Sequence, residues 1–205
     1  MLGLLAAARG LRRTEPIEDL LTLKFGIRMD QPGRMERDFQ TARTMDGSTA
    51  FPLTYRYYLA DAVFIAAVEG DDDLVQGLDA AIRHPVFPLY LGRRSCPPVG
   101  PIDMGARQAG ISDALQTEPW QAALWWRRRQ APAVQLELRM DIECIRQGDE
   151  VITLTDQHDL PISFDPRLRQ YGTRSVAQTF ITMVNPDSRL AGSSIHDPMA
   201  VLGGA

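Results

Sequence analysis

The chain has 205 residues, and its 44% hydrophobic and 23% charged residues are typical of a globular protein with a buried core. Its net charge of −4 argues against a basic protein that coats nucleic acid without specificity. No run is long enough to span a bilayer, no signal peptide is recognisable and Cys96 lies far from Cys144, so we expect a cytoplasmic, reduced protein without membrane contact.

Helix and strand patterns alternate in the first half of the chain. A helix is predicted over residues 2–12, because small residues and leucines lead to Gly10, a residue type that commonly ends helices. Apolar and polar residues alternate over 21–29, which predicts a strand with one buried face. The apolar run 62–68 predicts a buried strand, and a helix is expected over 71–84, where a proline follows.

The second half of the chain reads mainly as strands. Apolar and polar residues alternate strictly over 134–144, which predicts a strand. A turn at 147–149 is expected to connect it to a second strand over 151–154, so that the two form a hairpin. A further strand over 173–184 is expected to close the core. Periodicity is lost from 186 to the C-terminus, which predicts a disordered tail.

The segment Pro88-Leu89-Tyr90-Leu91-Gly92-Arg93-Arg94-Ser95-Cys96-Pro97-Pro98 is the most specific motif. A glycine between an aromatic residue and two arginines, closed by prolines, predicts a rigid loop that brings N–H groups and guanidinium forks to a polyanion. Tyr90 can stack on a base, and Arg93 and Arg94 can each hold a phosphate or a base edge. The alternative is an ordinary surface loop with solvated arginines.

Two other segments carry candidate binding residues. The polar segment 31–55 predicts a long hairpin or an irregular excursion, and long excursions in compact domains are usually functional or disordered. The run Trp125-Trp126-Arg127-Arg128-Arg129 has two interpretations: a stacking patch for RNA with a basic flank, or an interface or partly buried aromatic pair with solvated arginines.

Catalytic and metal-binding patterns are not found. His84 ends a helix before a proline, His158 sits among acidic residues and His196 lies in the tail. The sequence pattern assembles no set of base, acid and oxyanion donor around any of them. Lys24, the one lysine among 22 basic residues, is alone on the polar face of its strand. No spacing of His, Cys, Asp and Glu fits a metal site, so we expect no catalytic residues, metal or cofactor.

The string YLGRRSCP at 90–97 resembles the glycine-rich loop of the CasD-type subunits of the type I-E CRISPR surveillance complex Cascade, in the RAMP superfamily. Three other stretches agree in order and spacing. They are residues 2–10, the pair 37–41 and 55–62, and the closing segment 159–176.

The resemblance implies an α+β, ferredoxin-like (RRM-like) fold of order βαββαβ. It places this domain at 1–100 with a thumb at about 31–58, a connector and a small C-terminal β-hairpin region at 101–185, and the tail at 186–205. In the family a central strand with a Gly-Pro-x-Gln-x-Trp segment precedes the first helix, and this strand is expected to be absent here.

The resemblance also implies a non-catalytic, RNA-binding subunit that caps the 5′ handle of CRISPR RNA in antiviral defence. The site residues implied are Tyr90, Gly92, Arg93, Arg94 and Ser95 of the loop, with Arg56, Arg37, Gln40 and Thr41 of the thumb. Apolar faces are expected to dock on the Cascade backbone subunit and the large subunit, with target DNA met only indirectly. Two alternatives are a metal-independent endoribonuclease of the type I-C kind and a protein-only scaffold.

Overall fold

The computed structural model describes residues 1–163 and 167–190. The helices are α1 (Leu2–Ala8), α2 (Asp72–Arg83), α3 (Ile111–Thr117) and α4 (Leu124–Arg127), with two 3₁₀ turns, η1 (Glu18–Thr22) and η2 (Ile142–Cys144). The strands are β1 (Lys24–Gln31), β2 (Arg34–Gln40), β3 (Thr54–Ala60), β4 (Val63–Glu69), β5 (Ala133–Asp141), β6 (Thr153–Ser163) and β7 (Gln170–Val184). Helices segregated from antiparallel strand pairs confirm the α+β class.

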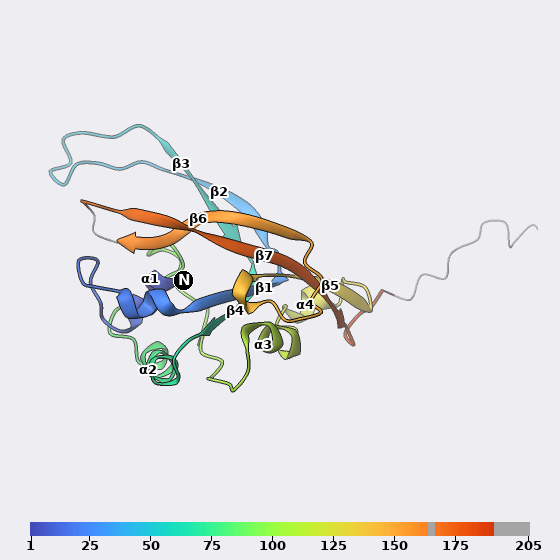
Figure 1. The fold of residues 1–205 in the computed structure, drawn as a ribbon. Helices are drawn as coiled ribbons and strands as arrows, with labels where there is room; N and C mark the ends of the chain where they lie inside the picture. The colour runs from blue at the N-terminus through green and yellow to red at the C-terminus, as the bar shows by residue number, and fades with distance from the viewer. Residues whose placement is uncertain (164–166, 191–205) are drawn as a thin grey trace, which may run out of the picture. The chain divides into compact units, whose positions relative to one another are not determined.

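The described strands form a five-stranded sheet of order β4-β1-β5-β7-β6 and a two-stranded sheet of β2 and β3 (Figure 1). By contacts the chain divides into two compact units. Unit 1 comprises Met1–Arg28, Ala66–Glu118 and Leu138–Phe180, and unit 2 comprises Met29–Ile65, Pro119–Glu137 and Ile181–Ala205. Each unit has its own hydrophobic cluster.

In unit 1, α1 and α2 pack side by side over a leucine-rich cluster (Figure 1). Its fully buried members include Leu5, Leu20 and Leu78, each at most 2% exposed. Helix α1 ends at Ala8, short of the predicted residue 12, and Gly10 follows its C-terminal cap with φ +83°. The amide of Leu11 donates to the Ala6 carbonyl, as in a Schellman motif, and a Cβ at position 10 would lie 2.9 Å from Val86. Only glycine fits there without strain.

Helix α2 is confirmed at both ends. The Asp71 carboxylate accepts from the amides of Asp73 and Leu74, so it caps the first turn. The helix stops at Arg83, and His84 is its C-terminal cap before Pro85.

Strand β1 differs from its prediction in two ways. Residues 18–22 form the turn η1, so the strand starts at Lys24 and runs to Gln31. Its fully buried face is the polar one, with Arg28 0% and Asp30 1% exposed. Burial is tolerated because both side chains are hydrogen-bonded: the Arg28 guanidinium donates to the carbonyls of Leu115 and Glu118 at 2.5 and 2.7 Å, and Asp30 accepts from the Gln121 amide.

The prediction that residues 62–68 form a buried strand is correct for the strand and wrong for its burial. β4 is an edge strand of the five-stranded sheet, and Ile65 is its only buried residue. Phe64 stays 44% exposed, because an edge strand has a neighbour on one side only.

The predicted hairpin between 134–144 and 151–154 is wrong. β7 lies between β5 and β6, and β6 pairs antiparallel with β7. The predicted turn contacts a helix and does not close a hairpin: Asp149 accepts from Ser112 and Gln116 of α3, at 2.7 and 3.0 Å.

Unit 2 has a smaller core around Trp120, Ala122 and Leu136. The Trp120 indole N–H donates to the Asp30 carbonyl at 2.8 Å. Of the tail predicted to be disordered, residues 186–190 are described and hydrogen-bond to the segment 127–131 through Ser188 and Arg189. Residues 191–205, including His196, and 164–166 lie outside the described residues.

Candidate nucleic-acid interface

The predicted thumb is an antiparallel hairpin of β2 and β3. Its register pairs Met35 with Leu59, Arg37 with Tyr57, and Phe39 with Tyr55. Side chains alternate between the two faces of a strand, so these six residues share one face. We call this the aromatic face of the hairpin.

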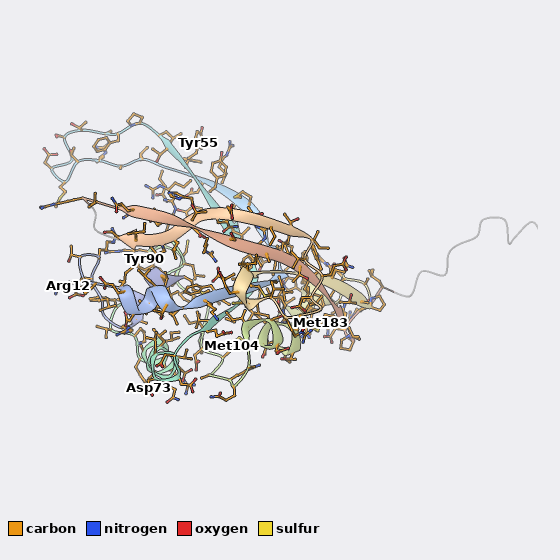
Figure 2. All side chains as sticks on the ribbon, viewed as in Figure 1. Arg12, Tyr55, Asp73, Tyr90, Met104 and Met183 are labelled. Atoms are coloured by element: carbon orange, nitrogen blue, oxygen red, sulfur yellow. The ribbon has the colours of Figure 1, made fainter. Side chains whose placement is uncertain are left out.

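The aromatic face is open. Its five apolar members, Met35, Phe39, Tyr55, Tyr57 and Leu59, are each between 51% and 68% exposed. The Arg37 guanidinium lies over the Tyr55 ring, 5.1 Å from its centroid. Figure 2 shows Tyr55 among the side chains of the hairpin. Exposed apolar surface of this kind typically marks an interaction site.

The opposite face of the hairpin is polar. The register pairs Asp38 with Arg56 and Gln40 with Thr54, and the Gln40 amide donates to Asp38 at 2.9 Å. Arg56 is half-buried, whereas Arg37 on the aromatic face is exposed. The structure therefore divides the predicted thumb residues: Arg37 lies on one face, Arg56 and Gln40 lie on the other, and the exposed Thr41 follows the end of β2.

The hairpin tip is ordered by local hydrogen bonds. The Asp46 carboxylate accepts from Thr44 and Ser48, and these bonds lower its pKa to about 2. Gly47 has φ +73°, which lets the chain reverse. Met45 is fully exposed beside this turn, at 108% of its reference area, so the tip presents an apolar side chain on a structured support.

The arginine loop, residues 90–96, forms neither helix nor strand, as predicted. The Leu91 amide donates to the Cys96 carbonyl at 2.8 Å, and the Cys96 amide donates to the Arg93 carbonyl at 2.9 Å. Gly92 has φ +82° with open space around it, so its role is conformational. Arg93, Arg94 and Ser95 are exposed, and Tyr90 is half-buried.

The segments on both sides of this loop are anchored within unit 1. The amides of Val86 and Phe87 donate to the carbonyls of Ala8 and Ala7 at the end of α1. On the far side, Asp103 pairs with Arg83 of α2 at 2.6 Å. The backbone amide of Gly105 and this guanidinium hold the pKa of Asp103 below its usual range. The arginine loop is thus held at a fixed place by α1 and α2.

The predicted site residues fall into two groups. Tyr90, Gly92, Arg93, Arg94 and Ser95 lie together in unit 1, and Arg37, Gln40, Thr41 and Arg56 lie together in unit 2. Of the aromatic face, only Arg37 was among the predicted site residues, and its apolar members Met35, Phe39, Tyr55, Tyr57 and Leu59 were not. The signal was present, because residues 35, 37 and 39 alternate with charged residues, and 55, 57 and 59 repeat at the same period.

Groups that could support catalysis are dispersed. His84 is exposed at the end of α2, and the His158 ring lies 3.4 Å from the Thr173 hydroxyl. Burial raises the pKa of Cys144 to about 11, which keeps that thiol protonated and unreactive. Across residues 1–163 and 167–190 no group of three or more His, Cys, Asp or Glu could hold a metal, and no helix there is long and apolar enough to cross a membrane.

Comparison with known proteins supplies the family. The family model described as CRISPR-associated protein (Cas_Cas5) matches residues 1–177. The chain belongs to the Cas5 family. The resemblance to CasD-type subunits found in the sequence is confirmed by a relative and by solved structures.

The relative is the CRISPR system Cascade subunit CasD of Escherichia coli (strain K12), 30% identical over 129 residues. The matched region is 53% of this Cas5 chain and 58% of that protein, so it spans less than two thirds of the relative. A structure titled "CRISPR RNA-guided surveillance complex" matches at a TM-score of 0.72 and 27% identity, over 98% of this chain and 84% of that one. A structure titled "Crystal structure of Cas protein" matches at a TM-score of 0.61 and 28% identity, over 91% of this chain and 78% of that one.

Proposed function

We propose that this Cas5 chain is a non-catalytic, RNA-binding subunit of a Cascade-type surveillance complex that caps the 5′ handle of CRISPR RNA. The observation that carries the proposal is the arginine loop: an exposed Arg93-Arg94 pair on a glycine-turned loop anchored to two helices. The likeness to a chain of a structure titled "CRISPR RNA-guided surveillance complex" supports RNA as the ligand of this loop.

The chemistry of the loop suits single-stranded RNA. Guanidinium forks bind phosphate or a base edge through two parallel hydrogen bonds, and an aromatic ring such as that of Tyr90 stacks on an unpaired base. Gly92 exposes its backbone without a side chain in the way. Arg94 and Ser95 are exposed and can approach a kinked handle without rearrangement.

The thumb hairpin supplies the second part of the proposal. Its aromatic face and the exposed Met45 at its tip offer contacts to unstacked bases or to the apolar surface of a neighbouring backbone subunit. Arg37 on this face, and Thr41, Gln40 and Arg56 elsewhere on the hairpin, are the residues by which the thumb would contact RNA. An isolated two-stranded ribbon is marginally stable, so cover by a partner would also stabilise the hairpin.

The ferredoxin-like placement belongs to the same proposal. What supports it is the order α1, β1, β4, α2, in which β1 and β4 are neighbours in the sheet. In a βαββαβ domain the strand that precedes the first helix would pair with β4, whose other edge carries no strand among the described residues.

The test changes the two loop arginines together in the complex assembled on CRISPR RNA. Arg93→Ala with Arg94→Ala should weaken RNA binding about 10-fold or more and reduce the salt slope by about 1.4, because two phosphate contacts are lost. Arg12→Ala with Arg13→Ala is the matched control, since this adjacent pair is also exposed in unit 1. Equal effects of the two double variants on assembly and salt slope would contradict handle capping.

A further inference from the structure

A second cluster of aromatic and basic side chains lies in unit 2, away in sequence from the thumb and the arginine loop. It sits on α4 and the turn after it, and we call Leu124, Trp125, Arg128 and Arg129 the Trp–Arg platform. Helix α4 is one turn long, with the amides of Trp126 and Arg127 donating to the Ala123 carbonyl. The platform residues thus come from a single, continuous turn.

The two tryptophans have different roles. Trp126 is half-buried and packs on the cluster of Trp120, Ala122 and Leu136. Trp125 is 43% exposed, and its ring stands at 88° to that of Trp126 with 5.7 Å between centroids. The edge-on contact fixes the orientation of the exposed indole, because its neighbour is anchored in the core.

The backbone beneath the platform is held by the segment that follows β7. The Asn185 side-chain amide donates to the carbonyls of Arg127 and Ala131 at 2.8 and 2.9 Å, with a longer contact of 3.4 Å to the Gln130 carbonyl. The Arg127 guanidinium pairs with Asp187 at 2.9 Å. A rigid support lowers the entropy that a ligand must overcome on binding.

The platform has excess positive charge. Asp187 neutralises Arg127, while no carboxylate in the described part of the chain forms an ion pair with Arg128 or Arg129. The Arg129 guanidinium lies over the Trp125 ring, 5.5 Å from its centroid. Two positive charges next to an oriented, exposed indole complement a ligand that has planar rings and regularly spaced negative charges.

We infer that the Trp–Arg platform is a second binding site for single-stranded nucleic acid. One base stacks on the Trp125 indole or on the Arg129 guanidinium plane, and the flanking phosphates pair with Arg128 and Arg129. The charge selects nucleic acid over an apolar protein segment, which would leave two guanidinium groups without partners in a buried interface. The site is additional to the loop that is proposed to cap the handle, and it does not depend on that function.

The experiment uses the full chain carrying Arg93→Ala and Arg94→Ala, so that the arginine loop does not contribute. Titration with a short oligouridine should quench tryptophan fluorescence, because Trp125 is the exposed indole and Trp120 is 8% exposed. Adding Trp125→Ala should lower the affinity about 5- to 150-fold and remove most of the quenching. Trp125→Tyr should retain most of the affinity, and Arg128→Ala with Arg129→Ala should reduce the salt slope by about 1.4.

Several outcomes would overturn the inference. One is an unchanged oligouridine affinity in Trp125→Ala, and another is the absence of oligouridine binding in the loop variant with an intact platform. Loss of partner subunits in Trp125→Ala with unchanged oligouridine binding would also overturn it and identify a protein contact. Equal melting temperatures of the Trp125 variants exclude misfolding as the cause, and Trp125→Tyr keeps the test valid if the alanine variant melts early.

Discussion

Arg174 on β7 donates to both carboxylate oxygens of Asp159 on β6, from Nε at 2.7 Å and from Nη2 at 2.9 Å. Its remaining nitrogen, Nη1, donates to Asp141 at the end of β5 at 2.5 Å. Asp141 in turn accepts from the Phe25 amide of β1. Asp159 lies where the β6–β7 register shifts, between Gln157 and Leu160, so one guanidinium secures an irregular part of the sheet to its neighbours.

Removing this guanidinium should destabilise unit 1. We expect Arg174→Ala to lower the free energy of unfolding by about 2–4 kcal/mol, since Asp141 would lose its charged partner while its side chain is only 11% exposed. Arg174→Lys should retain only part of this stabilisation, because an ammonium group cannot form the bidentate contact with Asp159. Urea denaturation measures the free energy of unfolding of both variants, with Arg13→Ala as the control at an exposed arginine. A loss in Arg174→Ala no larger than in the control would contradict this role.

The same pair predicts a pH dependence of stability. The hydrogen bonds from Arg174 hold the pKa of Asp159 below its usual value of 3.8. A lowered folded-state pKa stabilises the protein above the unfolded-state pKa, and this contribution is lost as the pH falls through the folded-state value. Asp159 is half-exposed, so we expect about 1 kcal/mol or less. The stability difference between wild type and Asp159→Asn should be constant near neutral pH and shrink below about pH 4; a difference that persists in acid would point to packing instead of charge.

The aromatic face of the hairpin should matter for association and not for folding. We expect Phe39→Ser with Tyr55→Ser to leave the melting temperature of the isolated chain unchanged, because both side chains are more than half exposed. The same variant should impair incorporation into the surveillance complex, measured by copurification with the partner subunits and CRISPR RNA. Glu36→Gln on the opposite face is the matched control. Normal incorporation of the double variant would show that this face is not an interface.

Incubation of the chain with a labelled CRISPR repeat hairpin in chelator should yield no discrete product. Cleavage needs a base for the 2′-hydroxyl and a group that stabilises the leaving oxygen, and the described histidines His84 and His158 lack such partners. The control is a repeat-cleaving endoribonuclease under the same conditions. A product that survives chelation and disappears in His84→Ala would favour the endoribonuclease alternative.

Features encoded by neighbouring residues were predictable from the sequence. Asp71 caps the amides of Asp73 and Leu74, and Gly10 ends α1 through bonds to the preceding turn, so each signal lies within a few residues of its effect. The arginine loop was predictable for the same reason, since its glycine and prolines act on their own backbone.

Features that depend on distant partners were not predictable. The polar side of β1 is buried because Arg28 reaches carbonyls near residue 115, and no local pattern distinguishes it from a solvated face. β6 pairs with β7, which follows it in the chain, and the turn before β6 contacts α3 through Asp149, and neither contact leaves a local pattern. Which residues of β3 share a face with Arg37 follows from the register of β2 and β3, which is fixed only when the hairpin forms.

Asn185 also bears on how this protein ages. Asparagine side chains deamidate when the next backbone nitrogen attacks the amide carbon to form a cyclic imide. The next residue is Pro186, whose nitrogen carries no hydrogen and cannot complete that reaction. A change to aspartate would replace a donor by an acceptor opposite the carbonyls of Arg127 and Ala131. The proline after Asn185 thus protects a side chain that supports the backbone beneath Trp125 from a common form of chemical decay.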